Sequence, residues 1–273
     1  FSWTRTNTTN LTGIANSGTG TFISGIFDNN TSTQQTTTFS ITATAGSCTS
    51  TTTVTVIVNP RPTVSATNIN QTICSGSPIA SIVITNPNAV AGTTFSWTRD
   101  NSINLTGIAA SGTGSRISGT LTNTTNIAQT TTFIITASSP AGCLSPTTAT
   151  ATITVNPRPT VSATPATQTI CSGTAITQID ITNPNNLPGT TFSWTRTNTT
   201  NLTGIANSGT GTSISGIFTN NTSTQQTTTF TITATTGRCS NTTTVTVIVN
   251  PKPTISATNT NQTICSGSAI TKI

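Results

Sequence analysis

The chain has 273 residues, of which 4% are charged, whereas a typical soluble domain has about 25%. It has no His and only three acidic residues, all Asp, so it lacks an imidazole base or metal ligand and a paired-carboxylate or calcium site. We therefore predict a protein that is not an enzyme and holds no cofactor or metal. The net charge of +6 comes from nine basic residues scattered along the chain, which disfavours nucleic-acid binding. No stretch approaches 18 apolar residues, so no membrane span is predicted.

Three short motifs recur along the chain at offsets of 94 and 97 residues, which is the size of one β-sandwich domain. They are Phe-Ser-Trp-Thr-Arg at Phe1, Phe95 and Phe192, Val-Asn-Pro at Val58, Val155 and Val249, and Ile-Cys-Ser-Gly at Ile73, Ile170 and Ile264. The first and third copies are nearly identical and the middle copy differs more. This pattern predicts an array of repeats that arose by duplication.

Proline-rich segments that begin at Asn59, Asn156 and Asn250 mark the boundaries between repeats. Alternating proline restricts the backbone, so we expect short, stiff joints. The predicted domains are the C-terminal part of an Ig-like repeat (1–60), two complete repeats (61–157 and 158–251) and the N-terminal strands of the next repeat (252–273). The chain begins within a motif, which suggests a piece of a longer protein.

Short strands with alternating apolar and polar residues are expected in each repeat, with turn signals every 8–12 residues. In the middle repeat they are predicted at Thr63–Ile69, Ser81–Thr85, Thr93–Arg99, weakly around Ile117 and Leu121, and at Thr131–Ser138 and Thr148–Val155. No segment has a clear 3.6-residue period, so almost no helix is expected. The fold class is therefore all-β, with tandem antiparallel β-sandwiches in an extended array.

Each repeat motif contains one Trp, and these are Trp3, Trp97 and Trp194. Each follows a Phe by two residues, which places both rings on one face of a strand. We predict that the three Trp lie in the core rather than on a sugar-stacking surface. Phe22, Phe27 and Phe218 are the aromatic residues outside predicted strands, and so are the candidates for an exposed binding surface.

The six cysteines alternate between two settings, which suggests disulfides in an oxidising, extracellular compartment. Gly-rich hairpin tips hold Cys48, Cys143 and Cys239, and the Ile-Cys-Ser-Gly loop holds Cys74, Cys171 and Cys265. These two settings are expected at opposite ends of a sandwich, too far apart for a bond within one repeat. An interdomain bond Cys74–Cys239 is then favoured, with Cys48 and Cys171 paired outside the fragment. Two rivals remain open: Cys74–Cys143 with Cys171–Cys239, and Cys48–Cys74.

The repeat begins Pro-Thr-Val-Ser-Ala, continues through Ile-Cys-Ser-Gly and Phe-Ser-Trp, and ends Val-Asn-Pro. This set resembles the PKD-like and Ig-like repeats of giant surface proteins from Bacteroidetes, including the gliding-motility adhesins of flavobacteria. The resemblance implies export by the type IX secretion system and a location at the outer membrane of the bacterial surface. The Trp-Asp-Phe-Gly-Asp motif of typical PKD domains is absent, since Thr98, Arg99 and Asp100 follow Trp97.

Together these observations predict structural stalk repeats of a large extracellular adhesin or filament for gliding or surface attachment. The stalk would contact neighbouring repeats of its own chain and hold a tip domain, outside this fragment, that binds a surface or polysaccharide. A carbohydrate-binding or surface-binding module that acts by avidity is one alternative. A self-assembling filament is the other, because few Lys protect the edge strands from lateral pairing with other copies.

Overall fold

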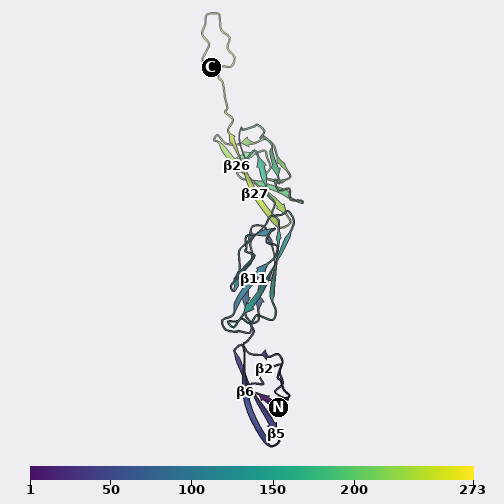
Figure 1. Cartoon of the computed structure of the whole chain (residues 1–273). Helices are drawn as coiled ribbons and strands as arrows, with labels where there is room; N and C mark the ends of the chain where they lie inside the picture. Colours follow the sequence, from purple (N-terminus) through teal and green to yellow (C-terminus); the bar gives the residue numbers. More distant parts are fainter. The chain divides into compact units, whose positions relative to one another are not determined.

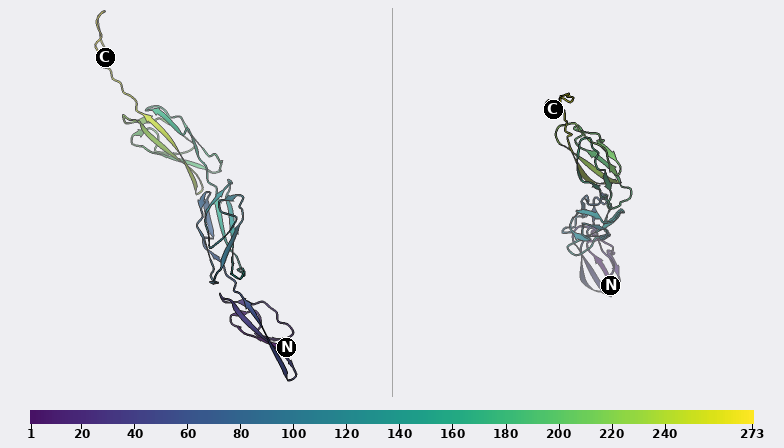
Figure 2. Two further views of the ribbon diagram at one scale, coloured as in Figure 1. Left: turned by 60° about the vertical axis from the view of Figure 1, so that its left-hand side comes forward. Right: turned by 90° about the horizontal axis from the view of Figure 1, so that it is seen from above.

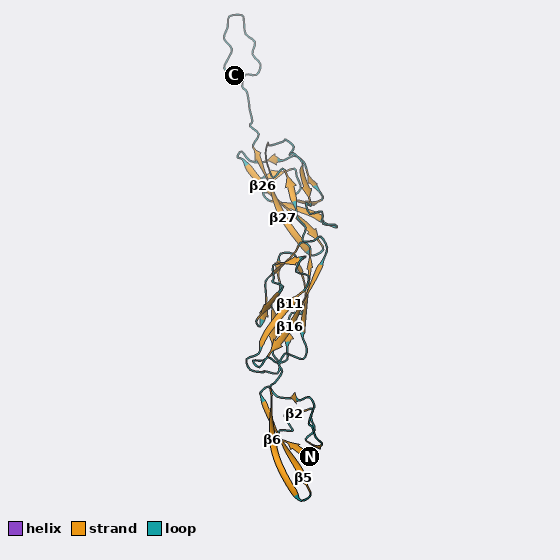
Figure 3. Cartoon of the chain, viewed as in Figure 1, coloured by secondary structure: helices purple, strands orange, loops and turns teal.

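The computed structural model describes all 273 residues, which form two compact units, Phe1–Pro157 and Arg158–Ile273. Every regular element is a β-strand (Figure 3), which confirms the predicted all-β class. No segment forms a helix long and apolar enough to cross a membrane.

The middle repeat is a sandwich in which one large sheet faces two small ones. Its strands are β7 (Ser65–Ala66), β8 (Asn70–Cys74), β9 (Ser77–Pro78), β10 (Ile82–Thr85), β11 (Thr94–Arg99), β12 (Leu105–Thr106), β13 (Ser111–Thr113), β14 (Arg116–Ile117), β15 (Thr120–Asn123), β16 (Gln129–Ser138) and β17 (Ala149–Asn156). The large sheet has the order β13-β11-β16-β17-β8, and the small sheets have the orders β14-β10-β7 and β12-β15-β9.

The third repeat has the same large sheet, in the order β19-β27-β26-β21-β23. Its long strands β26 and β27 are labelled in Figure 1, and Figure 2 shows the repeat, in green, from two further sides. Smaller sheets join β18, β20 and β24, and β22 and β25. Its strands are β18 (Ser162–Thr164), β19 (Thr167–Cys171), β20 (Ile179–Thr182), β21 (Thr191–Arg196), β22 (Leu202–Thr203), β23 (Ser208–Thr210), β24 (Ser213–Ile214), β25 (Thr219–Asn220), β26 (Gln226–Thr236) and β27 (Cys239–Asn250).

The first repeat has a smaller sheet, in the order β3-β1-β5-β6. Its strands are β1 (Ser2–Arg5), β2 (Leu11–Thr12), β3 (Ser17–Thr19), β4 (Asp28–Asn29), β5 (Gln35–Ala45) and β6 (Cys48–Val58), and β2 pairs with β4. At the other end of the chain, residues 252–273 form no strand.

Alternation along the central strands builds the core of each complete repeat. In β16, Phe133 and Ile135 are fully buried, and the intervening Ile134 is 47% exposed. Full burial of one such apolar side chain contributes about 1.5–3 kcal/mol to stability. Thr suits the outer face because a β-branched residue packs well on a pleated sheet.

Two details differ from the sequence prediction. The first strand is shorter than the predicted Thr63–Ile69, because only Ser65–Ala66 pairs with β10. The chain then crosses to the large sheet, and Asn70–Cys74, predicted as a loop, forms β8. This strand runs parallel to β17, with Asn70 opposite Thr152 and Cys74 opposite Asn156, so the sandwich is not purely antiparallel.

Candidate functional site at the repeat ends

One asparagine side chain ties the entry segment of each complete repeat to the sandwich. In the middle repeat, Asn88 Nδ2 donates to the carbonyl oxygen of Arg61 at 2.8 Å, and its Oδ1 accepts from the backbone N–H of Thr63 at 2.9 Å. In the third repeat, Asn185 makes the same bonds to Arg158 and Thr160. The residues directly after each proline joint are therefore held in place.

The exit segment is tied by the Ile-Cys-Ser-Gly turn. The backbone N–H of Ser75 donates to the carbonyl oxygen of Asn156 at 2.8 Å, and that of Ser172 donates to Asn250 at 2.9 Å. A buried asparagine supports the same end of the last strand, because Asn220 Nδ2 donates to the carbonyl oxygen of Val249 at 3.0 Å. Both sides of a proline joint are thus anchored by hydrogen bonds within their own repeats.

The predicted cysteines lie at these two ends. Cys74 is opposite Asn156 at the exit end of the middle repeat. Cys239 follows the β26–β27 turn and pairs with Thr236, whose hydroxyl lies 2.9 Å from that of Thr190, near the entry segment of the third repeat. Both cysteines are disulfide-bonded. The other four cysteines are free thiols: Cys48, Cys143, Cys171 and Cys265.

Both rival pairings are wrong, because each needs a cysteine that is free. Cys143 and Cys171 exclude the bonds within one repeat, and Cys48 excludes a bond to Cys74. The strand register explains the first result. Cys74 lies level with the start of β16, and Cys143 lies beyond its end, since its neighbour Leu144 bridges to Ser138. Nine residues of strand span about 30 Å, far beyond the reach of a disulfide.

A buried arginine lies at the start of the loop after the Trp strand in every repeat. Arg196 is 7% exposed, and its guanidinium donates to the carbonyl oxygens of Leu202 at 3.0 Å and Ile205 at 2.8 Å. Its Cζ lies 5.2 Å from the ring centroid of Phe218. Burial removes water from the charged group and lowers the pKa of Arg196. This arginine therefore holds the loop against the core, because its guanidinium binds carbonyl groups of the loop backbone.

The sequence prediction missed this role for Arg5, Arg99 and Arg196. Period-2 alternation contains the signal, because Phe95, Trp97 and Arg99 fall on the same face of β11. Arg99 donates to the carbonyl oxygens of Leu105 and Ile108, and burial lowers its pKa against the opposing effect of Asp100. Three of the nine basic residues are therefore buried, and the surface is less basic than the net charge suggests.

The Trp residues differ between the complete and incomplete repeats. Trp97 and Trp194 are each 8% exposed and pack edge-on against Phe133 and Phe230. Trp3 contacts Phe39 in the same way but is more exposed.

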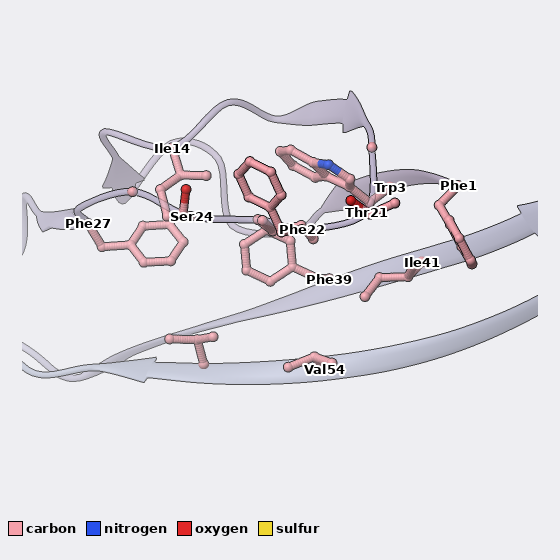
Figure 4. Close-up of a pocket in the computed structure, with 14 residues that line it drawn as sticks. Phe1, Trp3, Ile14, Thr21, Phe22, Ser24, Phe27, Phe39, Ile41 and Val54 are labelled. Carbon is pink, nitrogen blue, oxygen red and sulfur yellow. The ribbon is translucent and has the colours of Figure 1, made fainter.

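The first repeat has an open apolar groove of about 560 Å³ along one side. Figure 4 shows Trp3, Phe22, Phe27 and Phe39 around it, above the two long strands. Phe22 is 79% exposed, but the matching position in the third repeat is Ser213. An aromatic that does not recur is a poor basis for a carbohydrate site repeated along the array.

Metal-binding clusters of three or more His, Cys, Asp or Glu side chains do not occur in the structure. The three aspartates lie far apart in the sequence, at positions 28, 100 and 180. Asp100 Oδ1 accepts from the backbone N–H of Thr132, and Asp180 Oδ1 accepts from Gln178 Nε2.

Solved structures similar to this chain are multidomain β-sandwich proteins. The human desmocollin-1 ectodomain is 12% identical with a TM-score of 0.26, and the match covers 91% of this chain and 53% of that chain. A SusE-like surface located polysaccharide binding protein from Bacteroides thetaiotaomicron is 13% identical with a TM-score of 0.30, covering 72% and 35%. The chain spans little more than half the length of the cadherin ectodomains that it matches. No curated protein matches it.

A family model for the PKD-like domain matches residues 71–159 and 168–253. The two matches cover well over half of the chain, and each ends beside a proline joint. The chain therefore belongs to the PKD-like domain family, in at least two tandem copies.

Proposed function

We propose that these repeats form the structural stalk of a large extracellular adhesin or surface filament of a bacterium, which serves surface attachment or gliding. The stalk contacts the neighbouring repeats of the same chain, and it holds away from the cell a domain, outside this fragment, that binds a surface or polysaccharide. The resemblance to Bacteroidetes surface proteins supports an outer-membrane location and export by type IX secretion.

The observation that carries this proposal is the separation of entry and exit within each repeat. The entry segment is held by Asn88 or Asn185, and the exit segment is held by Ser75 or Ser172 at the far end of the last strand. A repeat with its chain ends on opposite sides extends an array by its own length. A repeat with adjacent ends would instead fold the array back.

A disulfide across the joint strengthens the stalk in this proposal. Cys74 lies at the exit end of the middle repeat, Cys239 lies at the entry end of the third, and both are disulfide-bonded. We place the bond between them, across the joint Asn156-Pro157-Arg158. It closes a long loop and so restricts bending that proline alone would allow.

Electron microscopy of the 273-residue chain tests the stalk. We expect separate lobes in a line, with a narrow distribution of the angle between the middle and third repeats. The Cys74→Ser variant should broaden this distribution, and Cys171→Ser, which removes a free thiol, should leave it unchanged. Repeats packed side by side in the unmodified chain would refute the stalk.

Peptide mapping without reductant tests the disulfide separately. The expected crosslinked peptide joins the segments of Cys74 and Cys239. A crosslink from Cys74 to any other cysteine of the monomer would show that the joint is held by proline and hydrogen bonds alone.

A further inference from the structure

The disulfide between Cys74 and Cys239 connects two points of the chain that are far apart in the sequence. Both cysteines are disulfide-bonded and the other four are free thiols, so the bond joins the middle repeat to the third. It closes a loop that contains residues 75–238, which are 164 of the 273 residues. A covalent path therefore leads from Arg61 to Pro251 without passing through this loop.

In the middle repeat this path crosses the sandwich once. It enters at Arg61, whose Nε donates to the carbonyl oxygen of Leu144 at the entry end, and it leaves at Cys74, opposite Asn156 at the exit end. The 14 residues of the segment 61–74 reach at most about 46–50 Å when fully extended. The ten residues of β16 place about 33 Å of strand between the same two ends. This segment can therefore lengthen by no more than about 20 Å.

In the third repeat the path again crosses the sandwich once, along a single strand. β27 begins at Cys239, at the entry end, and runs to Asn250, directly before Pro251 at the exit joint. Its 12 residues already rise by about 3.3 Å each, whereas a fully stretched chain reaches at most about 3.6 Å per residue. Hydrogen bonding to β26 and β19 also holds this strand along its length. This part of the path has almost no length to release.

The backbone between the same two residues is much longer than the path. Arg61–Pro251 has 191 residues, which reach about 630–690 Å when fully extended. The path through the disulfide has 27 residues and reaches about 95–105 Å, including the step across the bond. A folded chain stores length where it turns back on itself. The strands from β9 to β26 all lie inside the closed loop, and so does the length that they store.

Building on the disulfide of the proposed function, we propose that this bond limits the extension of the chain under tension. The load passes along residues 61–74 and 239–251, which cross each sandwich without turning back at a hairpin. The loop contains the joint at Pro157 and both core tryptophans, Trp97 and Trp194. Even complete unfolding of the loop adds no length to the path.

This limit also protects the fold inside the loop. A pulling force favours an unfolded state in proportion to the length that unfolding adds to the chain. Because unfolding of residues 75–238 adds none between Arg61 and Pro251, tension between these two residues gives that part of the fold no drive to unfold. The two complete repeats then carry load as a strap of fixed length.

Single-molecule force spectroscopy of the full 273-residue chain, held by tags at its two termini, tests this proposal. With the bond intact, the covalent path consists of residues 1–74 and 239–273, so we expect a final length of about 360–400 Å. After reduction with tris(2-carboxyethyl)phosphine, the same protein should reach about 900–980 Å. The gain should match the 164 residues of the loop.

Two variants serve as a matched pair. Cys74→Ser should give the long extension without reductant, whereas Cys171→Ser, which removes a free thiol, should give the short one. The comparison before and after reduction uses one folded protein, so it decides the question even if Cys74→Ser folds poorly. An unmodified chain that releases the length of the loop before reduction, or one that stays short after it, would overturn the proposal.

Failure of the extension limit and failure of the stalk give different results. A chain that shows lobes in a line and the Cys74–Cys239 peptide, yet releases the length of residues 75–238 before reduction, would refute only the limit. Repeats packed side by side in a chain that stays short would refute the stalk and leave the limit standing.

Discussion

Gly112 faces the indole ring of Trp97 so closely that a Cβ atom on the glycine would lie 2.4 Å from Cζ2 of the ring. The two residues are directly opposite each other in the pairing of β11 with β13. The same arrangement joins Gly209 to Trp194 in the third repeat and Gly18 to Trp3 in the first. Because glycine has no side chain, the Trp ring can lie directly against the neighbouring strand at this position.

Gly112→Ala should therefore lower the free energy of unfolding of the middle repeat by about 1–3 kcal/mol, because the ring must leave its position. Thr113→Ala changes the next residue, which is exposed, and serves as the control. Chemical denaturation followed by Trp fluorescence measures both. Equal stability of the two variants would show that the ring moves without cost.

Arg196→Met should destabilise the third repeat by about 3 kcal/mol or more. It leaves the carbonyl oxygens of Leu202 and Ile205 buried without their donor, at a cost of about 1–3 kcal/mol each. Arg196→Lys keeps the positive charge but lacks the planar guanidinium with its several N–H donors, so the stability of this variant should be intermediate. The measurement is thermal unfolding of the 158–273 region within the full chain. A Met variant as stable as the unmodified protein would contradict the role of the guanidinium hydrogen bonds.

Asn220→Ala should cost about 1–3 kcal/mol, because Asn220 Nδ2 bridges the carbonyl oxygens of Val249 at 3.0 Å and Thr224 at 2.8 Å. Asn221→Ala, at the next and exposed position, is the matched control. Hydrogen exchange at the end of β27 should also rise in the first variant only. Unchanged exchange there would mean that the strand end is held by Ser172 alone.

Much of the fold could be predicted from the sequence because long strands alternate clearly. In β16, Phe133 and Ile135 point inward from a Thr-rich strand, and their pattern is visible without the structure. Trp97 follows the same rule. These positions are set by local periodicity, which a single sequence contains.

The features that could not be predicted depend on distant partners. Asn70–Cys74 has a single aliphatic residue, Ile73, and becomes a strand only through its parallel pairing with β17, about 80 residues away in the chain. Arg99 lies on the inward face, but its charge suggested the surface, and only the loop carbonyls show why it is buried.

The parallel pairing of β8 with β17 has a mechanical consequence. Tension between Arg61 and Pro157 pulls these two strands along their length in opposite directions, so the hydrogen bonds between Asn70–Cys74 and Thr152–Asn156 are loaded together in shear rather than opened one after another. Single-molecule force spectroscopy should then find a higher rupture force when the middle repeat is pulled from its termini than when it is pulled across the β16–β17 hairpin. Equal forces in both directions would show that the shear contact carries no load. In the stalk that we propose, this order of strands would let each repeat resist a sudden pull along the chain.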